Sequence, residues 1–348
     1  MIYNLKYELE AKNTMLKKLF IKLIKIIISA AIALTALTAF CFFYSNPPIH
    51  YATPDGPTDY KWASDRFRSQ ATEGFSFGKT NNEGCFNTEN HYAGETIDIL
   101  IMGSSQMEAA NVMPTESTAA LLGKKLNDKT VYNIGTSGHY LPTCAANLES
   151  ALTTYEPRSF VIVQTDNLLF SDDELIQALE CTVPEIPSYN TGIIGILQHN
   201  CFLRHLYHQG KNYTDKTPVD TEPVQQQAAD YGAVTNRDLL SQLLSNMASK
   251  VSAHGAKLLI IYDPWTGISA DGSLVVKGNP SEVDQYREIC AENGILFLDM
   301  TGRFISEYEQ NFTLPYGFSN TAVGTGHLNR YGHAMIADEL FKLISEVE

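Results

Sequence analysis

A serine, a histidine and glycine-rich turns are the residues of this sequence whose types could do chemistry together. Ser105 follows Gly103 and Ser104 at the end of an apolar run, and His327 lies in the glycine-rich stretch 324–333. A hydroxyl, an imidazole and backbone N–H groups are the nucleophile, the general base and the oxyanion donors of acyl transfer. The sequence therefore points to acyl transfer if the fold brings Ser105 and His327 together.

Five apolar stretches separated by helical patterns are the elements that would position these residues. Continuous aliphatic runs that alternate with helices indicate a doubly wound parallel α/β sheet. No GxGxxG turn follows the first run, so no dinucleotide cofactor is expected. The predicted strands are residues 97–102, 130–134, 160–163, 257–262 and 295–299.

If the strand order is the flavodoxin-like 2-1-3-4-5, the switch point lies between the first and third strands. The loops at this point carry Ser105 and residues 166–167. His327 lies in a predicted long loop, 300–328, just before a last helix that starts near Asn329. We therefore expect Ser105 and His327 at the same edge of the sheet.

The order of these blocks resembles the SGNH (GDSL-like) hydrolases, which have a flavodoxin-like sheet and four short signature blocks. The resemblance covers residues 97–348. Gly103-Ser104-Ser105 is similar to the block that ends in the nucleophile, which implies Ser105. Residues 133–138 resemble the block whose glycine gives an N–H group to the oxyanion hole, which implies Gly138. His327 is similar to the catalytic base of the last block.

The third block departs from the family pattern. The family has an asparagine that binds the oxyanion, and the matching residue here is Asp166. A carboxylate there would repel the developing negative charge. Either Asn167 serves through a local shift, or the hole relies on the N–H groups of Ser105 and Gly138.

The last block departs as well, because the acid that normally lies three residues before the histidine is Gly324. The orienting group is then a backbone carbonyl or an acid from another strand end, with Asp263 and Asp299 as candidates. Such a group fixes the tautomer of the base, so losing it lowers the rate without abolishing the chemistry.

The amino-terminal segment has the pattern of a signal anchor. Residues 26–44 are 19 residues without a charge, and six lysines but only two glutamates lie within residues 6–25. About 20 apolar residues span a bilayer as a helix, and basic flanks stay inside. We expect residues 1–25 in the cytoplasm, a single-pass anchor over 26–44 and an extracytoplasmic remainder. A cleaved signal peptide is the alternative, although no clear small-x-small site follows the apolar run.

The rest of the sequence predicts a linker or hairpin region over 45–96 and an α/β domain over 97–348 with an insertion at about 172–233. The net charge of −14 argues against nucleic acid as a partner. The six cysteines have no metal-site spacing, and His205 and His208 lack a third ligand, so no metal is predicted.

These observations predict a membrane-anchored serine esterase or O-acyltransferase that acts on acyl esters, chiefly acetyl esters, of cell-envelope carbohydrate. The resemblance also implies a membrane-embedded acyl-transfer protein as a partner. Two alternatives stay open: a lipid esterase or thioesterase, and a catalytically weakened domain that binds carbohydrate. The sequence does not decide between hydrolysis and transfer, because both pass through the same acyl-enzyme.

Overall fold

The computed structural model describes residues 2–46, 50–52, 60–181, 200–214 and 235–348. Contacts between residues divide the chain into two units. The smaller unit comprises Met1–Ser45 and Asn190–Lys216, and the larger comprises Asn46–Tyr189 and Thr217–Glu348.

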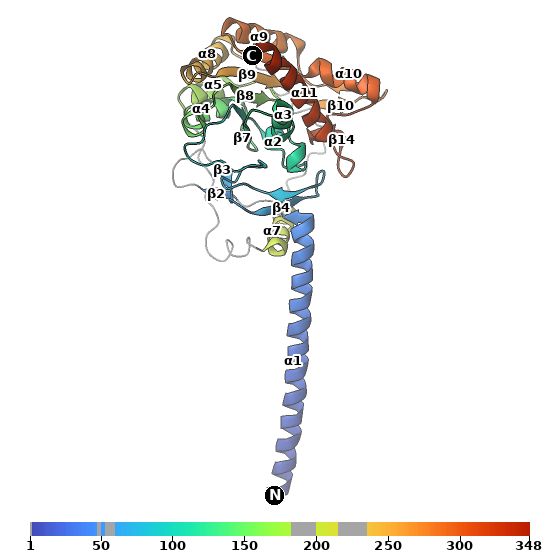
Figure 1. Ribbon diagram of the computed structural model, residues 1–348. Helices are drawn as coiled ribbons and strands as arrows, with labels where there is room; N and C mark the ends of the chain where they lie inside the picture. Colours follow the sequence, from blue (N-terminus) through green and yellow to red (C-terminus); the bar gives the residue numbers. More distant parts are fainter. Residues whose placement is uncertain (1, 47–49, 53–59, 182–199, 215–234) are drawn as a thin grey trace. The chain divides into compact units, whose positions relative to one another are not determined.

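The larger unit is built on a five-stranded parallel sheet with the order β12-β9-β8-β6-β7 (Figure 1). Numbered along the chain, this is the flavodoxin-like order 2-1-3-4-5, so the predicted fold class is confirmed. The strands are β6 (Ile99–Met102), β7 (Val131–Asn133), β8 (Phe160–Thr165), β9 (Lys257–Tyr262) and β12 (Leu296–Asp299).

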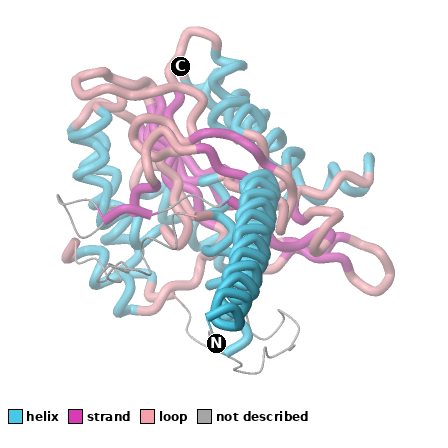
Figure 2. The backbone as a smooth tube through the Cα atoms, turned by 90° about the horizontal axis from the view of Figure 1, so that it is seen from below, coloured by secondary structure: helices cyan, strands magenta, loops and turns pink. Residues whose placement is uncertain are grey.

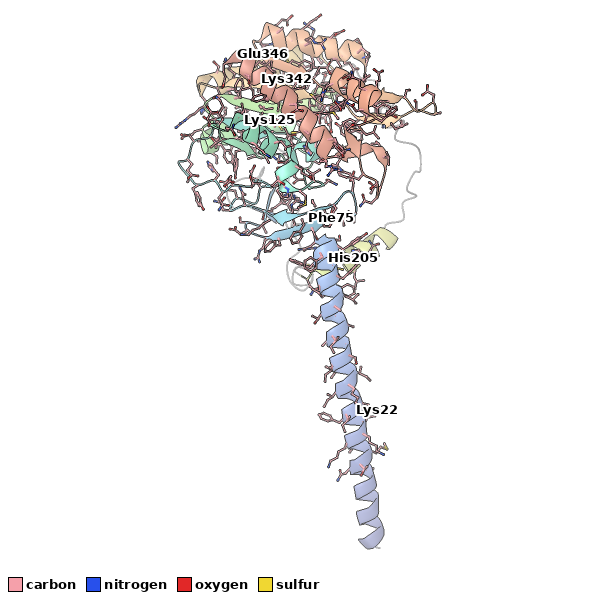
Figure 3. The ribbon with its side chains drawn as sticks, turned by 45° about the vertical axis from the view of Figure 1, so that its right-hand side comes forward. Lys22, Phe75, Lys125, His205, Lys342 and Glu346 are labelled. Atoms are coloured by element: carbon pink, nitrogen blue, oxygen red, sulfur yellow. The ribbon has the colours of Figure 1, made fainter. Side chains whose placement is uncertain are left out.

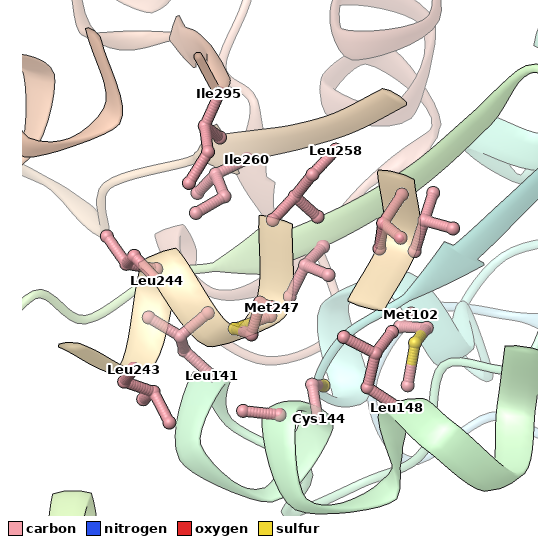
Figure 4. Packing of buried hydrophobic residues seen from close by; sticks show 14 of the residues in the cluster. Met102, Leu141, Cys144, Leu148, Leu243, Leu244, Met247, Leu258, Ile260 and Ile295 are labelled. Carbon is pink, nitrogen blue, oxygen red and sulfur yellow. The ribbon is translucent and has the colours of Figure 1, made fainter. Parts of the chain in front are cut away.

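Alternate side chains of the central strands enter two separate cores. In β6, Leu100 and Met102 join one cluster, and Ile99 and Ile101 join the other. Both faces of the strand are buried, which is why it has no polar residue. Figure 4 shows the first cluster, where Met102 lies among side chains from neighbouring helices.

Helices cover both faces of the sheet, as the tube in Figure 2 shows. Four helices contribute to the first cluster: α4 (Leu141–Tyr155), α5 (Asp172–Leu179), α8 (Arg237–Ala253) and α9 (Pro280–Glu292). Four contribute to the second: α2 (Ser105–Glu108), α3 (Thr118–Leu126), α10 (Thr301–Asn311) and α11 (Arg330–Val347). The labelled Lys125 and Lys342 mark α3 and α11 in Figure 3.

An antiparallel hairpin precedes the sheet in the chain. It consists of β4 (Phe67–Gln70) and β5 (Ser76–Lys79). Arg68, which is 1% exposed, donates from Nη1 to the Ser76 hydroxyl and to the Ala110 carbonyl, each at 2.7 Å. The second bond fixes the hairpin to the segment that follows the short helix α2 (Ser105–Glu108).

The remaining elements of the larger unit are short. Asn46 of β1 (Ser45–Asn46) donates to the Phe67 carbonyl at 3.1 Å. Three further antiparallel pairs are β2 (His50–Ala52) with β3 (Tyr60–Trp62), β10 (Thr266–Ile268) with β11 (Leu274–Val276), and β13 (Tyr316–Gly317) with β14 (Val323–Leu328). A 3-10 turn, η1, spans Pro114–Glu116.

The prediction of a long loop over residues 300–328 was wrong, because α10 and the β13–β14 pair lie within this segment. Phe304 is the single fully buried residue of α10, so the segment lacks the run of several apolar residues that predicts a core helix. The start of the last helix was correct: Asn329 caps α11 by accepting from the N–H groups of Tyr331 and Gly332.

The smaller unit contains α1 (Ile2–Tyr44) and α7 (Cys201–Thr214). Within α1, Lys12–Tyr44 is long and apolar enough to cross a membrane, and 6% of its most apolar window is buried. Thr38 of α1 and Asn200 are hydrogen-bonded through their side chains at 3.3 Å. Of the predicted insertion at about 172–233, residues 182–199 and 215–233 lie outside the described residues.

Candidate active site

The turn after β6 presents Ser105 at the carboxyl edge of the sheet. Gly103 is required here, since a Cβ would lie 2.6 Å from Oε1 of Gln164. The same oxygen accepts from the Ser104 N–H at 2.9 Å and from the Ser104 hydroxyl at 3.1 Å. Ser104 in turn caps α2 by accepting from the Gln106 N–H. The turn is thus fixed on both sides of the peptide that leads to Ser105.

Ser105, His327 and Glu73 form a continuous hydrogen-bonded line. Nε2 of His327 lies 3.1 Å from the Ser105 Oγ, and Nδ1 lies 2.7 Å from Oε2 of Glu73. The other oxygen of Glu73 accepts from the His327 backbone N–H at 2.9 Å. These are the contacts of a nucleophile, a base and an acid that orients the base.

The acid beside His327 is therefore Glu73, which corrects the expectation of Asp263 or Asp299. Asp263 is fully buried and accepts from Nε2 of Gln164 at 2.6 Å. Asp299 accepts from Nη2 of Arg287 at 3.0 Å. The expectation failed because it considered strand ends only, whereas Glu73 lies in the turn between β4 and β5.

Gly326 makes room for this carboxylate. Its φ is +97°, and a Cβ there would lie 2.5 Å from Oε1 of Glu73. A glycine next to the histidine was visible in the sequence, but no spacing rule connects it with a residue far away in the chain. Glu73 was consequently missed, and its neighbour Gly74, at φ +71°, was the only local turn signal.

The ion pair sets the titration of both groups. The hydrogen bond with Glu73 raises the pKa of His327 above its ordinary 6.5, although burial acts in the opposite direction. Burial alone would raise the pKa of Glu73, but the bonds from the side chain and backbone of His327 outweigh it, and this pKa is lowered from 4.5. The pair is therefore ionised more readily than either group alone.

The loop that carries Gly138 is tied to the nucleophile turn. The Thr136 N–H donates to the Gly103 carbonyl at 2.9 Å, and the Ser137 hydroxyl donates to Glu108 of α2. Gly138 has a φ of +84° and open space where a Cβ would stand. The Ser105 N–H is at the first position of a helix, where N–H groups have no intrahelical partner. Both groups remain our predicted oxyanion donors.

The Asn167 side chain is held within its own loop. Its Nδ2 donates to the Leu169 carbonyl at 2.7 Å, and its Oδ1 accepts from the Leu169 N–H at 3.0 Å. The structure thus engages this amide away from Ser105, contrary to the expected role in the oxyanion hole. Asp166 is 9% exposed, and burial raises its pKa, although the nearby Trp265 and Gln106 side chains favour its charged form.

A cavity of about 70 Å³ adjoins the two turns. Gly103, Glu108, Thr136 and His139 are among the residues that line it. Among the residues that the structure describes, no group of three or more histidine, cysteine, aspartate or glutamate side chains could hold a metal ion. His205 lies in α7, while the side chain of His208 is not described.

No protein-family model matches the sequence, and no curated protein is similar to it. Several solved structures share 13–14% sequence identity with the chain. An acetyl xylan esterase, AlAXEase, covers 71% of this chain and 99% of its own, with a TM-score of 0.43. Esterase EstA from Pseudoalteromonas sp. covers 72% and 97%, with a TM-score of 0.39. A protein from Veillonella parvula covers 71% and 98%, with a TM-score of 0.41, and is described as a member of the lipolytic G-D-S-L family, the family that the sequence blocks resemble.

Proposed function

We propose that this chain is a serine esterase or O-acyltransferase that acts through Ser105. The observation that carries the proposal is the line from the Ser105 Oγ through His327 to Glu73, with separations of 3.1 and 2.7 Å. A serine hydroxyl is a weak nucleophile unless a base takes its proton, and a base works best when a third group fixes its tautomer. The three residues supply these roles in order.

In the proposed reaction the Ser105 Oγ attacks the acyl carbonyl while Nε2 of His327 takes its proton. The carbonyl oxygen becomes an oxyanion, which the N–H groups of Ser105 and Gly138 stabilise. Collapse of the tetrahedral intermediate breaks the bond to the leaving alcohol, which receives the proton from His327. Glu73 keeps Nδ1 protonated and stabilises the imidazolium that forms transiently.

The acyl-enzyme then reacts with water, which gives hydrolysis, or with a sugar hydroxyl, which gives transfer. We propose short acyl groups, chiefly acetyl on cell-envelope carbohydrate, as the substrate class. The cavity of about 70 Å³ lined by Gly103 and Thr136 adjoins the Ser105 turn and has room for only a few non-hydrogen atoms, but neither Ser105 nor His327 lines it. The apolar helix Lys12–Tyr44 supports an anchored enzyme. A membrane-embedded acyl-transfer protein would be the acyl donor if the reaction is transfer.

A lipid esterase is the second candidate, because apolar side chains are exposed near the strand of His327. Val323 of β14 is 62% exposed, and Ile268 and Val275 of the β10–β11 pair are 41% and 45% exposed. A long acyl chain could lie on them. Hydrolysis rates over a series of p-nitrophenyl esters from acetate to octanoate separate the two candidates: a maximum at acetate supports the first, and a maximum at six or more carbons supports the second.

The test of the proposed function is labelling of the full chain, solubilised in detergent, with a fluorophosphonate. We expect the label on the Ser105 peptide by mass spectrometry, none in Ser105→Ala, little in His327→Ala, and wild-type labelling in the control Ser249→Ala, which changes an exposed serine of α8. An unlabelled chain that still shows a cooperative thermal transition would overturn the proposal.

A further inference from the structure

The side chain of Gln106 joins the nucleophile helix to the segment that carries the base. Gln106 follows Ser105 in α2, and its Oε1 accepts from the Leu328 N–H at 2.8 Å. Its Nε2 donates to the Gly326 carbonyl at 3.4 Å. One amide thus contacts the residues on both sides of His327, while its own backbone is next to Ser105.

A buried anchor holds this amide in place. Gln106 is 2% exposed, so water does not compete for its polar atoms. Asp166, also buried, lies close enough to the Gln106 and Trp265 side chains that both favour its charged form and partly offset the rise in its pKa that burial causes. A carboxylate has only acceptors, which suits a position that faces two N–H donors. An asparagine at this position would turn its own NH₂ group toward one of those donors or lose a bond.

The histidine is consequently held in two independent ways. Glu73 contacts the imidazole and the N–H of His327, and so fixes the ring and its tautomer. Gln106 contacts the peptides before and after His327, and so fixes the backbone relative to Ser105. Displacement of a reacting group by about 1 Å can cost about 100-fold in rate.

We propose that Gln106 is a positioning residue that sets the separation between the Ser105 Oγ and Nε2 of His327, and that Asp166 holds the Gln106 amide in the required orientation. The inference rests on the proposed function, since it concerns the same two groups. It gives Asp166 a role that does not depend on the oxyanion: its carboxylate is occupied by the amide beside the nucleophile.

The test compares variants of the full chain in detergent with p-nitrophenyl acetate as substrate. Gln106→Leu keeps the side-chain size and removes both hydrogen bonds to the residues beside His327, and Gln242→Leu, at an exposed position of α8, is the matched control. We expect kcat to fall about 100-fold in Gln106→Leu with KM within about twofold of wild type, because transition-state alignment is lost and substrate binding is not. The control should keep both constants.

A swap of the two side chains separates positioning from general packing. In Gln106→Glu two carboxyl groups face each other, and kcat should fall at least as far as in Gln106→Leu. In the double variant Gln106→Glu with Asp166→Asn, the introduced amide can donate to the introduced carboxylate, and we expect kcat to recover at least about tenfold over Gln106→Glu. A purely structural role would change the thermal midpoint without this recovery of kcat.

Two results would overturn the inference. One is a kcat of Gln106→Leu within about threefold of wild type, and the other is an unchanged kcat with a raised KM. If Gln106→Leu does not fold, the swap decides: no recovery over Gln106→Glu, with both variants folded, refutes the positioning role. Failure of the proposed function is distinct, because the wild-type chain itself would then neither take a fluorophosphonate label nor hydrolyse the ester.

Discussion

Glu73 and His327 are 254 residues apart in the sequence, and the two oxygens of Glu73 bond Nδ1 and the backbone N–H of this one histidine at 2.7 and 2.9 Å. Such a double contact fixes both the plane of the ring and the backbone of strand β14, which carries it. The base of the site is therefore oriented by a residue that lies outside the sheet.

Replacing Glu73 should reduce activity more than binding. In Glu73→Gln an amide NH₂ can face Nδ1 and favour the wrong tautomer, so we expect kcat to fall by about 10²- to 10⁴-fold. Steady-state kinetics with p-nitrophenyl acetate check this, with Glu309→Gln, an exposed glutamate of α10, as the matched control. An active Glu73→Gln with wild-type kcat would show that the contact is only structural.

The rate should depend on pH through His327. The base must be neutral to accept a proton, and Glu73 raises the pKa of His327 above 6.5. We expect kcat/KM to rise with pH to a plateau, with a midpoint above 6.5, and the midpoint should move to lower pH in Glu73→Gln. A midpoint that is the same in both proteins would contradict the assignment.

The same pair predicts a pH window for stability. A raised His327 pKa adds stability that is complete below the unfolded value of 6.5 and lost as pH rises through the folded value. A lowered Glu73 pKa adds stability that is complete above 4.5 and lost as pH falls through the folded value. The difference in thermal midpoint between wild type and Glu73→Gln should thus be largest between pH 4.5 and 6.5. Since both side chains are partly exposed, we expect a small difference.

Gly326→Ala should disconnect Glu73 without unfolding the protein. The new Cβ would lie 2.5 Å from the mobile end of the Glu73 side chain, which can swing away at the expense of its bonds to His327. The backbone at φ +97° adds strain of about 1–3 kcal/mol. We expect a loss of kcat similar to that of Glu73→Gln and a lower melting temperature. Gly302→Ala in α10, where a Cβ meets no atom within 4 Å, is the control and should keep activity and stability.

Glu108 should make the stability of the larger unit fall with rising pH. It is 3% exposed, accepts from Nε1 of Trp62 at 2.6 Å, and its pKa is raised from 4.5 by burial. A folded state that binds a proton more tightly than the unfolded chain loses stability as pH rises above the unfolded value of 4.5. Glu108→Gln removes this titration, so its melting temperature relative to wild type should increase from pH 4.5 upward. A constant difference across this range would contradict the expectation.

The amino-terminal helix should hold the protein in a membrane as an uncleaved anchor. We expect a chain with an epitope at each end to remain in the membrane pellet after alkaline carbonate extraction, with both epitopes on one polypeptide, because Lys12–Tyr44 is long and apolar enough to span a bilayer. A carboxyl-terminal epitope on a shorter, released polypeptide would show that the segment is a cleaved signal instead.

The local pattern of apolar and polar residues was sufficient to predict the sheet and two residues of the site. Strands β6, β8 and β9 are largely aliphatic runs whose burial follows from composition, and the parallel sheet follows from the alternation of strands with helices. Ser105 and His327 could be chosen because both stand at element boundaries with glycine nearby, and the structure brings them within 3.1 Å. A short stretch of sequence is enough to locate the end of a strand or the start of a helix.

Glu73 and Gln106 could not be chosen in that way. Glu73 reaches the site through the packing of a hairpin, which depends on the buried Arg68 and its bond to the Ala110 carbonyl. Gln106 looks like any polar residue of a short helix until the fold places Gly326 and Leu328 against it. Asp166 could be interpreted from the sequence only as a misfit in the oxyanion hole, because its neighbours Trp265 and Gln106 come from other parts of the chain.

The turn that carries Glu73 also makes the acid separable from the scaffold. The five-stranded sheet needs no part of the β4–β5 hairpin for its strand pairing. The hairpin meets the site through contacts such as those of Glu73 with His327 and of Arg68 with the Ala110 carbonyl. A change in the hairpin can therefore remove the acid from the site while the sheet that positions Ser105 stays intact.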